Sequence, residues 1–329
     1  MQVSRCRAFN NTGDPNYLKN HSGSGMVLYQ VDGGLIEHCE AWNNGAECRS
    51  NTGGGVGIWA CASRRVIIQH CESFANRTSG RDGGGFDLDG GCIECVLQYN
   101  YSHDNDGPGL MVYTYAYASH ADRGNVVRFN ISENDSRKSR TYAGLWVRSD
   151  GSRMTGLEVY NNTVIIGPWS DQAAAVYGAE VEASFRNNIF VGQGPAVPLR
   201  VFRSHEKIRF ENNLYWREGG PMQIVWDEQA FATLDEWRQK IGQELVAGRP
   251  VGRVAAPALS AHPRTVRTGE RVGLEQLRAF HPLKYSPASA GGLDLRTQFG
   301  LDMGERDFVG TSLSHSARFP LGAISGPAK

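Results

Sequence analysis

The sequence has no excess of charge of either sign. Its 329 residues include 34 Lys and Arg against 34 Asp and Glu, which gives a net charge of +0. A nucleic-acid-binding surface needs clustered Lys and Arg, and here they are scattered, so no nucleic-acid partner is expected. No apolar run approaches the roughly 20 residues of a membrane-spanning helix, so no membrane partner is expected either.

Segments that read as helices are also scarce, and the cysteines do not form an evident set of pairs. Residues 1–216 contain no stretch that reads as a helix of about 10–15 residues between strands, which excludes a compact α/β fold. With 13 prolines against 40 glycines, the composition indicates a turn-rich β protein.

The seven cysteines are an odd number, so at least one is unpaired within the chain. Cys92 and Cys95 have zinc or redox spacing, but no second pair lies at a suitable distance.

What the sequence does contain is a repeat, with short apolar strands recurring at intervals of 25 to 33 residues. Its first register is occupied by Cys6, Cys39, Cys71, Asn100, Asn130, Asn162, Asn188 and Asn213. A second register, five residues further on, holds Asn11, Asn44, Asn76, Asn105 and Asp135. A third, three residues after the first, holds Phe9, Trp42, Phe74 and His103. Self-similarity at such a period is the signature of a stacked repeat architecture.

A parallel stack of coils explains all three registers. Equivalent residues in successive coils then lie about 4.8 Å apart, so Asn side chains can hydrogen-bond in a ladder and aromatic rings can stack. Cysteines in three adjacent coils are consistent with small buried thiols. A disulfide between adjacent coils is an open alternative, since that separation permits one.

The pattern V-x-I-x-x-(N/C)-x-(I/A/S)-x-x-N, followed by a glycine and a further strand, resembles the right-handed parallel β-helix proteins of the pectate-lyase-like superfamily. Residues 3–216 fit this pattern over about eight coils, and the stretch GFDLDGG…YNYSHDNDGPG is similar to a segment of bacterial β-helix repeat proteins. The resemblance implies an all-β fold, a right-handed single-stranded parallel β-helix. The chain lacks the Asp-Asp and Gly-His-Gly motifs of polygalacturonases and the Asp-Pro-His motif of alginate epimerases, so none of those specificities is carried over.

One strand of each coil follows a glycine and alternates between inward and outward side chains. The positions expected to face inward are Met26/Leu28, Ile58/Ala60, Phe86/Leu88, Leu110/Val112 and Leu145/Val147. Those expected to face outward are Val27/Tyr29, Trp59/Cys61, Asp87/Asp89, Met111/Tyr113 and Trp146/Arg148. The outward positions predict one exposed stripe with two carboxylates near its middle and aromatic residues on both sides.

This stripe predicts a saccharide site. Paired carboxylates do acid–base work at a glycosidic oxygen, so Asp87 and Asp89 are the predicted catalytic pair. Aromatic rings stack on sugar rings, and the predicted substrate-binding residues are Trp59, Tyr113, Trp146, Arg148 and, from the segment 114–123, Tyr115 and His120.

His103 and its acidic neighbours are predicted to support the pair. His103 replaces an aromatic residue of the third register, and the carboxylates that flank it would raise its pKa. His103 and Asp104 therefore join the predicted catalytic residues, although a stacked ring that continues the ladder is equally open. Asp106 is a candidate ligand for Ca²⁺. The leading hypothesis requires no cofactor.

The leading function is therefore a glycoside hydrolase acting on a polysaccharide or oligosaccharide. One alternative enzyme is a polysaccharide lyase or uronate epimerase assisted by Ca²⁺. An alternative from another class is a non-catalytic glycan-binding or adhesin module, because solenoids form extended binding surfaces.

The chain divides into residues 1–216, the β-helix, and residues 217–329, a tail expected to pack on or cap the solenoid. In the tail, Thr233 and Glu236 form a capping box that opens a short helix, which Gly242 closes. The first residues already read as part of a coil, so upstream residues or another chain are expected to cover them. The expected location is secreted, periplasmic or at the cell surface, although this sequence carries no signal peptide.

Overall fold

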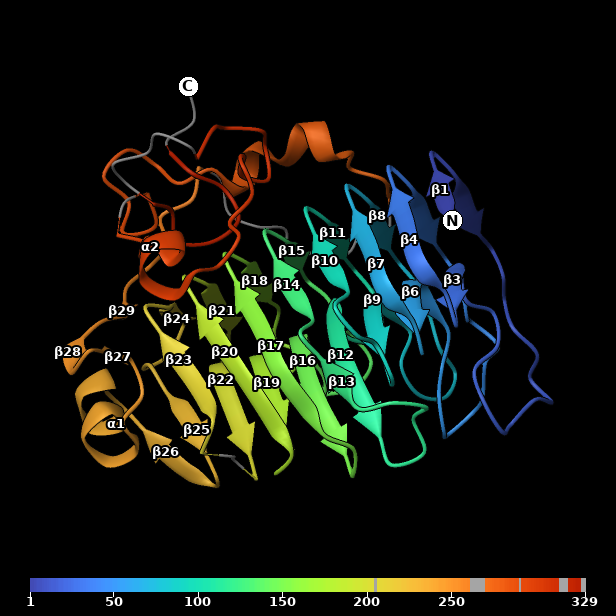
Figure 1. The fold of residues 1–329 in the computed structure, drawn as a ribbon, viewed down its shortest axis with the longest axis horizontal. Helices are drawn as coiled ribbons and strands as arrows, with labels where there is room; N and C mark the ends of the chain where they lie inside the picture. Colours follow the sequence, from blue (N-terminus) through green and yellow to red (C-terminus); the bar gives the residue numbers. More distant parts are fainter. Residues whose placement is uncertain (204–205, 261–269, 290, 314–318, 327–329) are drawn as a thin grey trace.

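Short strands follow one another around a coil, and successive coils stack in parallel along one axis (Figure 1). The structure is a computed structural model that describes residues 1–203, 206–260, 270–289, 291–313 and 319–326. Within these residues each of eight coils supplies one strand to each of three sheets, here called A, B and C. The predicted all-β fold of about eight parallel coils is confirmed.

The three sheets take their strands in chain order from coil to coil. Sheet A holds β1 (Gln2–Ser4), β4 (Asp32–Glu37), β7 (Arg64–Gln69), β10 (Val96–Gln98), β14 (Val126–Arg128), β17 (Met154–Tyr160), β20 (Val181–Arg186) and β23 (Ile208–Glu211), with β13 (Asp122–Arg123) beside β17. Sheet B holds β2 (Arg7–Phe9), β5 (Glu40–Trp42), β8 (Glu72–Phe74), β11 (Tyr101–His103), β15 (Ile131–Glu133), β18 (Thr163–Ile166), β21 (Ile189–Gln193), β24 (Leu214–Glu218) and β29 (Arg253–Val254). Sheet C holds β3 (Met26–Tyr29), β6 (Val56–Cys61), β9 (Gly84–Asp89), β12 (Leu110–Tyr115), β16 (Ala143–Asp150), β19 (Gln172–Tyr177), β22 (Val197–Phe202), β25 (Ile224–Trp226) and β26 (Gln229–Phe231).

The first predicted register is a buried ladder of amides. Asn130 Nδ2 donates to Asn162 Oδ1 at 3.0 Å, and the same bond recurs from Asn162 to Asn188 and from Asn188 to Asn213, each at 3.0 Å. The ladder ends on a carboxylate, because Asn213 Nδ2 donates to Glu244 Oε1 at 2.9 Å. Each amide also satisfies a backbone group, so the ladder pairs polar atoms that the coil corner buries.

The other two registers stack as the sequence indicates. In the second, Asn76 Nδ2 donates to Asn105 Oδ1 at 2.9 Å, and Asn105 Nδ2 donates to Asp135 Oδ1 at 2.8 Å. In the third, ring centroids lie 4.4 Å apart for Phe9 and Trp42, 5.6 Å for Trp42 and Phe74, and 5.0 Å for Phe74 and His103. The strand alternation is also confirmed, since the inward residues of β6, β9, β12 and β16 are fully buried in the core.

The last coil and the tail close the solenoid. Sheet C continues past residue 216 into β25 and β26. Helix α1 (Leu234–Ile241) then covers the end of the stack, where Trp237 is fully buried against Phe210, Tyr215 and Trp226. The predicted capping box is present, because Thr233 accepts a bond from Glu236 N at 3.2 Å, and Gly242 is the C-cap with φ of 77°.

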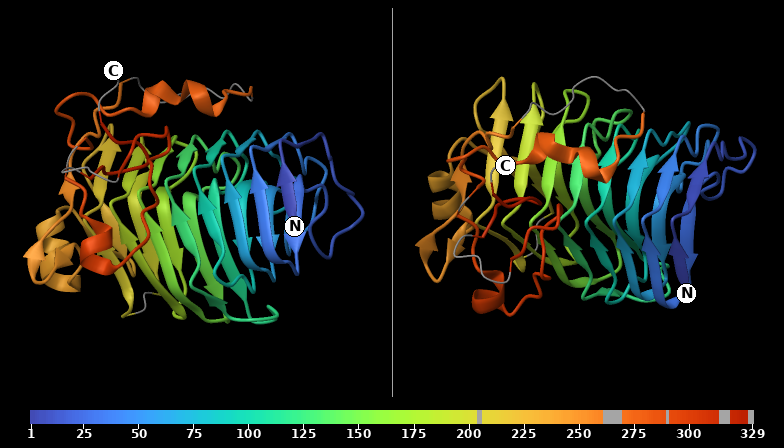
Figure 2. Two further views of the ribbon diagram at one scale, coloured as in Figure 1. Left: turned by 45° about the horizontal axis from the view of Figure 1, so that its top comes forward. Right: turned by 90° about the horizontal axis from the view of Figure 1, so that it is seen from above.

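The rest of the tail lies on the outer face of sheet B (Figure 2). It carries the 3-10 helix η1 (Leu274–Phe280) and the helix α2 (Leu295–Phe299), whereas the short pair β27 (Leu245–Val246) and β28 (Arg249–Pro250) lies beside α1 at the end of the stack (Figure 1). Buried tail residues such as Leu295, Met303 and Leu321 pack on Ile131 and Ile189 of sheet B in one apolar cluster. The parts of the predicted tail at 261–269, 290, 314–318 and 327–329 lie outside the described residues. Among the helices that the structure describes, none combines the length and the apolar character needed to cross a membrane.

Candidate functional site

Sheet C presents two rows of outward side chains, one residue from each strand. The first row runs through Val27, Trp59, Asp87, Met111, Trp146, Ala175 and Arg200. The second row runs through Tyr29, Cys61, Asp89, Tyr113, Arg148, Tyr177 and Phe202. Thus the structure brings both predicted carboxylates and the predicted Trp59, Tyr113, Trp146 and Arg148 onto one face, in the predicted order.

The first row is not the open stripe that the sequence predicts. Trp59, Asp87 and Trp146 are only 5%, 2% and 7% exposed. Loops between sheets B and C cover them: the His21 ring meets Trp59 edge-on at 4.7 Å, and the Tyr142 ring meets Trp146 edge-on at 5.1 Å. The prediction of exposed indoles was wrong because strand alternation gives the direction of a side chain but not what folds over it.

The predicted catalytic pair lies in a cluster of carboxyl groups. Burial, and then the neighbouring Asp89, Asp82 and Asp122, raise the pKa of Asp87 well above its usual range. Burial likewise raises the pKa of Asp89 to about 7, although a hydrogen bond from the Gly90 N–H opposes it. Buried Oδ1 atoms of Asp87 and Asp89 accept no hydrogen bond from any residue that the structure describes. Near neutral pH, Asp89 can therefore exchange a proton, and the pKa of Asp87 beside it is also raised by burial and by the neighbouring carboxyl groups.

Two further carboxylates frame this pair. Asp82 Oδ1 accepts from the Tyr142 hydroxyl at 2.9 Å, and its Oδ2 accepts from Gly54 N at 2.6 Å. Asp122 is fully buried, accepts from Gly91 N at 2.7 Å, and has a pKa raised to about 8, chiefly by burial. Neither residue was predicted, because no register of the repeat relates Asp82, in the loop before β9, or Asp122, in β13 of sheet A, to Asp87 and Asp89.

This cluster predicts that the protein loses stability as pH rises from about 4 to about 8. The folded-state pKa values of Asp89 and Asp122 are about 7 and about 8 against a usual 3.8, so the folded state holds more protons in this window. Each group then contributes a slope of up to about 1.4 kcal/mol per pH unit. We expect Asp122→Asn to make the free energy of unfolding depend less on pH, because Asn does not ionise. At the alkaline end the variant should be more stable than wild type, since Asn also keeps the oxygen that accepts from Gly91 N. Urea unfolding across the window checks this, and a wild-type stability that rises with pH would contradict it.

The second row is more open and ends in a cleft. Arg148 Nε donates to both oxygens of Asp150 at 2.8 and 2.9 Å, and Tyr113 donates to Asp150 Oδ2 at 3.0 Å. The Arg148 guanidinium lies over the Trp146 and Tyr177 rings at 5.6 and 5.7 Å. Beyond it, the Tyr177 and Phe202 rings stack at 4.6 Å. These contacts hold an aromatic and basic surface in place without covering it.

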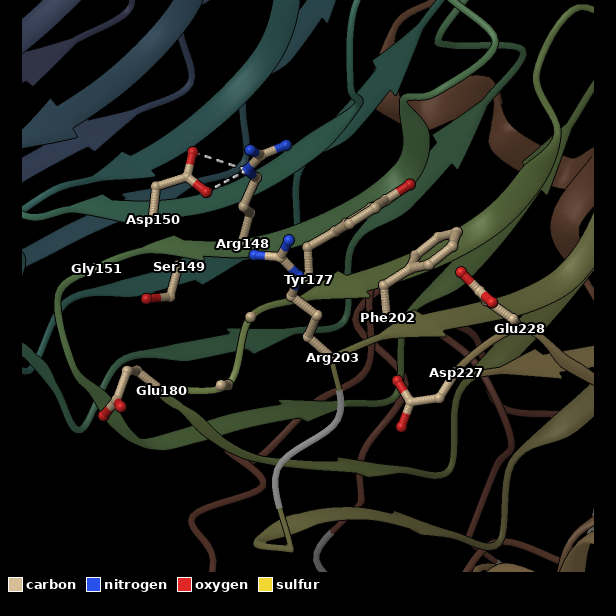
Figure 3. A pocket seen from close by; sticks show the side chains of 12 residues that line it. Arg148, Ser149, Asp150, Gly151, Tyr177, Glu180, Phe202, Arg203, Asp227 and Glu228 are labelled. Carbon is tan, nitrogen blue, oxygen red and sulfur yellow. Dashed lines mark hydrogen bonds and ion pairs between the residues drawn. The ribbon is translucent and has the colours of Figure 1, made fainter.

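The cleft has a volume of about 950 Å³ and opens beside Tyr177 and Phe202 (Figure 3). Its other walls carry Arg148, Asp150, Glu180, Arg203, Asp227 and Glu228. Tyr177 and Phe202 were not among the predicted residues. The same alternation continues through 174–177 and 199–202, so extending the pattern by two coils would have found them.

The predicted rim residues differ in their positions. Tyr115 packs on Gly90, where an added Cβ would come within 2.8 Å of the ring, and its hydroxyl lies 3.7 Å from Cys61 Sγ. A hydrogen bond from Tyr115 also lowers the pKa of Asp89, which places the phenol beside the pair. His120 is exposed in the loop that follows.

His103 and Asp104 do not support the pair, which corrects that prediction. His103 belongs to β11 of sheet B, whereas Asp87 and Asp89 belong to sheet C. The His103 ring is 1% exposed, and its nitrogens lie 3.2 Å from Asp104 Oδ2 and 3.1 Å from Glu72 Oε1. Burial lowers the pKa of His103, but the hydrogen bonds to Asp104 and Glu72 outweigh it and raise the pKa. His103 therefore continues the ring ladder and ties sheet B to the tail through Glu72, which accepts from Val272 N at 2.7 Å.

The surroundings of Asp106 do not fit a bound cation. Its Oδ2 accepts from Thr78 N at 3.1 Å, and its Oδ1 lies 3.9 Å from the Arg77 guanidinium. Both neighbours present hydrogen-bond donors, and one is positively charged, so they would repel Ca²⁺. Across the described parts of the chain, no group of three or more His, Cys, Asp or Glu residues is arranged to hold a metal ion.

The stacked coils define the class of protein, a parallel β-solenoid. Residues 1–164 match the family model described as the right handed beta helix region, which covers the first five coils and the start of the sixth. The chain is a right-handed parallel β-helix protein. Its fold is consistent with pectate-lyase-like proteins and with glycosidases. No curated protein matches the chain.

Proposed function

We propose that this protein hydrolyses glycosidic bonds in a saccharide chain that lies along the second row of sheet C. The observation that carries the proposal is Asp89: a carboxyl with a pKa of about 7 and a buried oxygen that has no hydrogen-bond partner among the described residues, beside Asp87, whose pKa is raised well above its usual range. Asp89 also lies in the second row, which continues from it through Tyr113 and Arg148 to the cleft. From Asp89 to Phe202 the row crosses four strand spacings, roughly 19 Å, which is long enough for an oligosaccharide.

The two carboxyl groups divide the chemistry according to their pKa values. Asp87, whose pKa burial and the neighbouring carboxyl groups raise well above its usual range, is the acid that donates a proton to the leaving glycosidic oxygen. Asp89 is the carboxylate that acts on the opposite side of the bond, as base toward water or as nucleophile. Tyr115 hydrogen-bonds Asp89 and stabilises its ionised form. The closed walls around Asp87 exclude water, which strengthens these interactions.

One observation favours a second candidate, a non-catalytic glycan-binding module. Asp87 is only 2% exposed, whereas the aromatic second row and the cleft are open. Such a module would use Tyr177 and Phe202 as its platform and would not depend on the carboxyl pair. A lyase has less support, because Asp150 already holds the Arg148 side chain that would neutralise a uronate.

A panel of neutral and uronate-containing polysaccharides tests the proposal. We expect new reducing ends without the ultraviolet absorbance of a C=C bond, and no reducing ends from the double variant Asp87→Asn/Asp89→Asn. Absorbance from an unsaturated product would replace the hydrolase with a lyase. Binding without turnover, equal in wild type and variant, would leave the binding module.

We expect Tyr177→Ala to weaken substrate binding without a loss of chemistry. The ring forms one wall of the cleft and stacks on Phe202, so its removal takes away a platform but leaves Asp87 and Asp89 unchanged. Aromatic contacts of this kind contribute about 0.5–1.5 kcal/mol, so KM should rise about 2- to 10-fold with kcat within about twofold. Initial-rate kinetics check this. Tyr285→Ala is the control, since Tyr285 is 86% exposed on the tail, and an equal effect of both variants would contradict the placement.

A further inference from the structure

Three cysteines stand at the same corner of three successive coils. Cys6, Cys39 and Cys71 each follow a residue with positive φ, namely Arg5 at 54°, His38 at 52° and His70 at 50°. Equivalent positions in adjacent coils are about 4.8 Å apart, inside the range of Cα separations that a disulfide spans. The corner is the one that later coils fill with the asparagine ladder, so the thiols replace amides in its first three steps.

The sulfur atoms make contacts along this stack. Cys39 Sγ lies 3.4 Å from Cys6 N, and Cys71 Sγ lies 3.4 Å from Cys39 N, so each sulfur points toward the preceding coil. Cys39 is therefore the shared member of two neighbouring thiol pairs. The hydrogen bond with the Cys71 thiol, opposed by burial, lowers the pKa of Cys39 to about 7. Cys39 thus has thiolate character near neutral pH.

The two neighbours of Cys39 differ in access and freedom. Cys71 is fully buried between coils, and its N–H donates to Asn100 Oδ1 at 3.0 Å. Cys6 is exposed, and in the part of the chain that the structure describes, the adjoining strands β1 and β2 pair on one side only. An oxidant can reach the exposed Cys6 thiol.

We propose that Cys6 and Cys39 form an oxidation-dependent disulfide that staples the first coil to the second. A peroxide oxidises the exposed Cys6 thiol to a sulfenic acid and releases one water. The Cys39 thiolate then attacks the Cys6 sulfur, forms the S–S bond and expels hydroxide, which takes up a proton as the second water. Two thiols and one peroxide thereby give one disulfide and two waters. Cys71 stays reduced below it.

Peptide mapping of the folded protein tests the staple. The protein is treated with hydrogen peroxide, free thiols are alkylated, and the unfolded chain is cleaved after glutamate. This cleavage places Cys6 in residues 1–37, Cys39 alone in 38–40, and Cys71 in 48–72. We expect 1–37 joined to 38–40 and five alkylated cysteines out of seven. A reductant should restore all seven and lower the thermal unfolding temperature.

Two variants separate the staple from general oxidation. Cys6→Ser changes an exposed side chain and should abolish the cross-link, whereas Cys48→Ser alters a buried thiol outside the stack and should keep it. Residues 38–40 joined to 48–72, the peptide that carries Cys48, Cys61 and Cys71, would show that Cys39 pairs with a cysteine other than Cys6 and would overturn the proposal. So would seven alkylated cysteines, or Cys6 oxidised without a cross-link.

Discussion

Replacing Asp89 by Asn is expected to lower kcat for glycoside hydrolysis by about 10²–10⁴-fold, the usual contribution of a group that transfers a proton in the transition state. The amide is almost the same size as the carboxyl, so the packing against Gly90 and Tyr115 is retained. What is lost is a group whose pKa of about 7 lets it exchange a proton near neutral pH. KM should change little, because the proposed binding depends on the aromatic and basic side chains of the second row and on the cleft, which the substitution leaves in place.

Two comparisons make this result specific. Asp32→Asn is the matched control, because Asp32 is an exposed carboxylate of sheet A that pairs only with the exposed Arg65 among the described residues. The pH profile of kcat/KM should also lose its acidic limb in Asp89→Asn, since that limb reports the ionisation of Asp89. An Asp89→Asn enzyme with wild-type turnover would remove the carboxyl pair from the mechanism.

The second large effect is on stability, and Asn130→Leu should show it. Asn130 Oδ1 accepts from Asn100 N at 3.0 Å and from Asn100 Nδ2 at 3.1 Å, while its own Nδ2 donates to Leu97 O at 2.8 Å and to Asn162 Oδ1. Leucine has a similar volume but none of these groups, so it leaves buried partners without hydrogen bonds. At 1–3 kcal/mol for each such group, partly relieved by rearrangement, the free energy of unfolding should fall by about 4 kcal/mol.

Denaturant unfolding measures this change, with Asn51→Leu as the control. Asn51 is exposed in a loop outside the ladder, so its substitution should stay within about 0.5 kcal/mol of wild type. Equal stabilities for the two variants would mean that the amide ladder does not hold the coils together. Glu244, which ends the ladder as a fully buried acceptor, should be as sensitive as Asn130.

The coils could be predicted from sequence because every coil must satisfy the same two requirements, hydrogen-bonded corners and an apolar interior. A corner that buries a backbone N–H needs a side-chain acceptor in every coil, and Asn162, Asn188 and Asn213 supply it at a constant place in the pattern. Inward strand positions must likewise be apolar in every coil, because every coil buries them in the core. Register and the direction of each strand residue follow from the repeat.

The site was less predictable because its walls come from parts of the chain that do not repeat. His21 and Tyr142 reach Trp59 and Trp146 from loops, and no periodicity marks them. His103 illustrates the opposite error: Asp104 raises its pKa as expected, together with Glu72 from the preceding coil rather than Asp106, yet the ring belongs to another sheet. Nearness in sequence within a coil does not place two side chains on the same face of a solenoid.

The most direct test of the account is a crystal structure of the Asp89→Asn variant with an oligosaccharide from the polysaccharide panel. We expect the sugar to lie along the second row, with its rings at Tyr113, Tyr177 and Phe202. One glycosidic oxygen should lie beside Asp87 and the substituted residue 89. A sugar bound on another face, or in the cleft alone and away from residues 87 and 89, would contradict the assignment of the carboxyl pair as the catalytic centre.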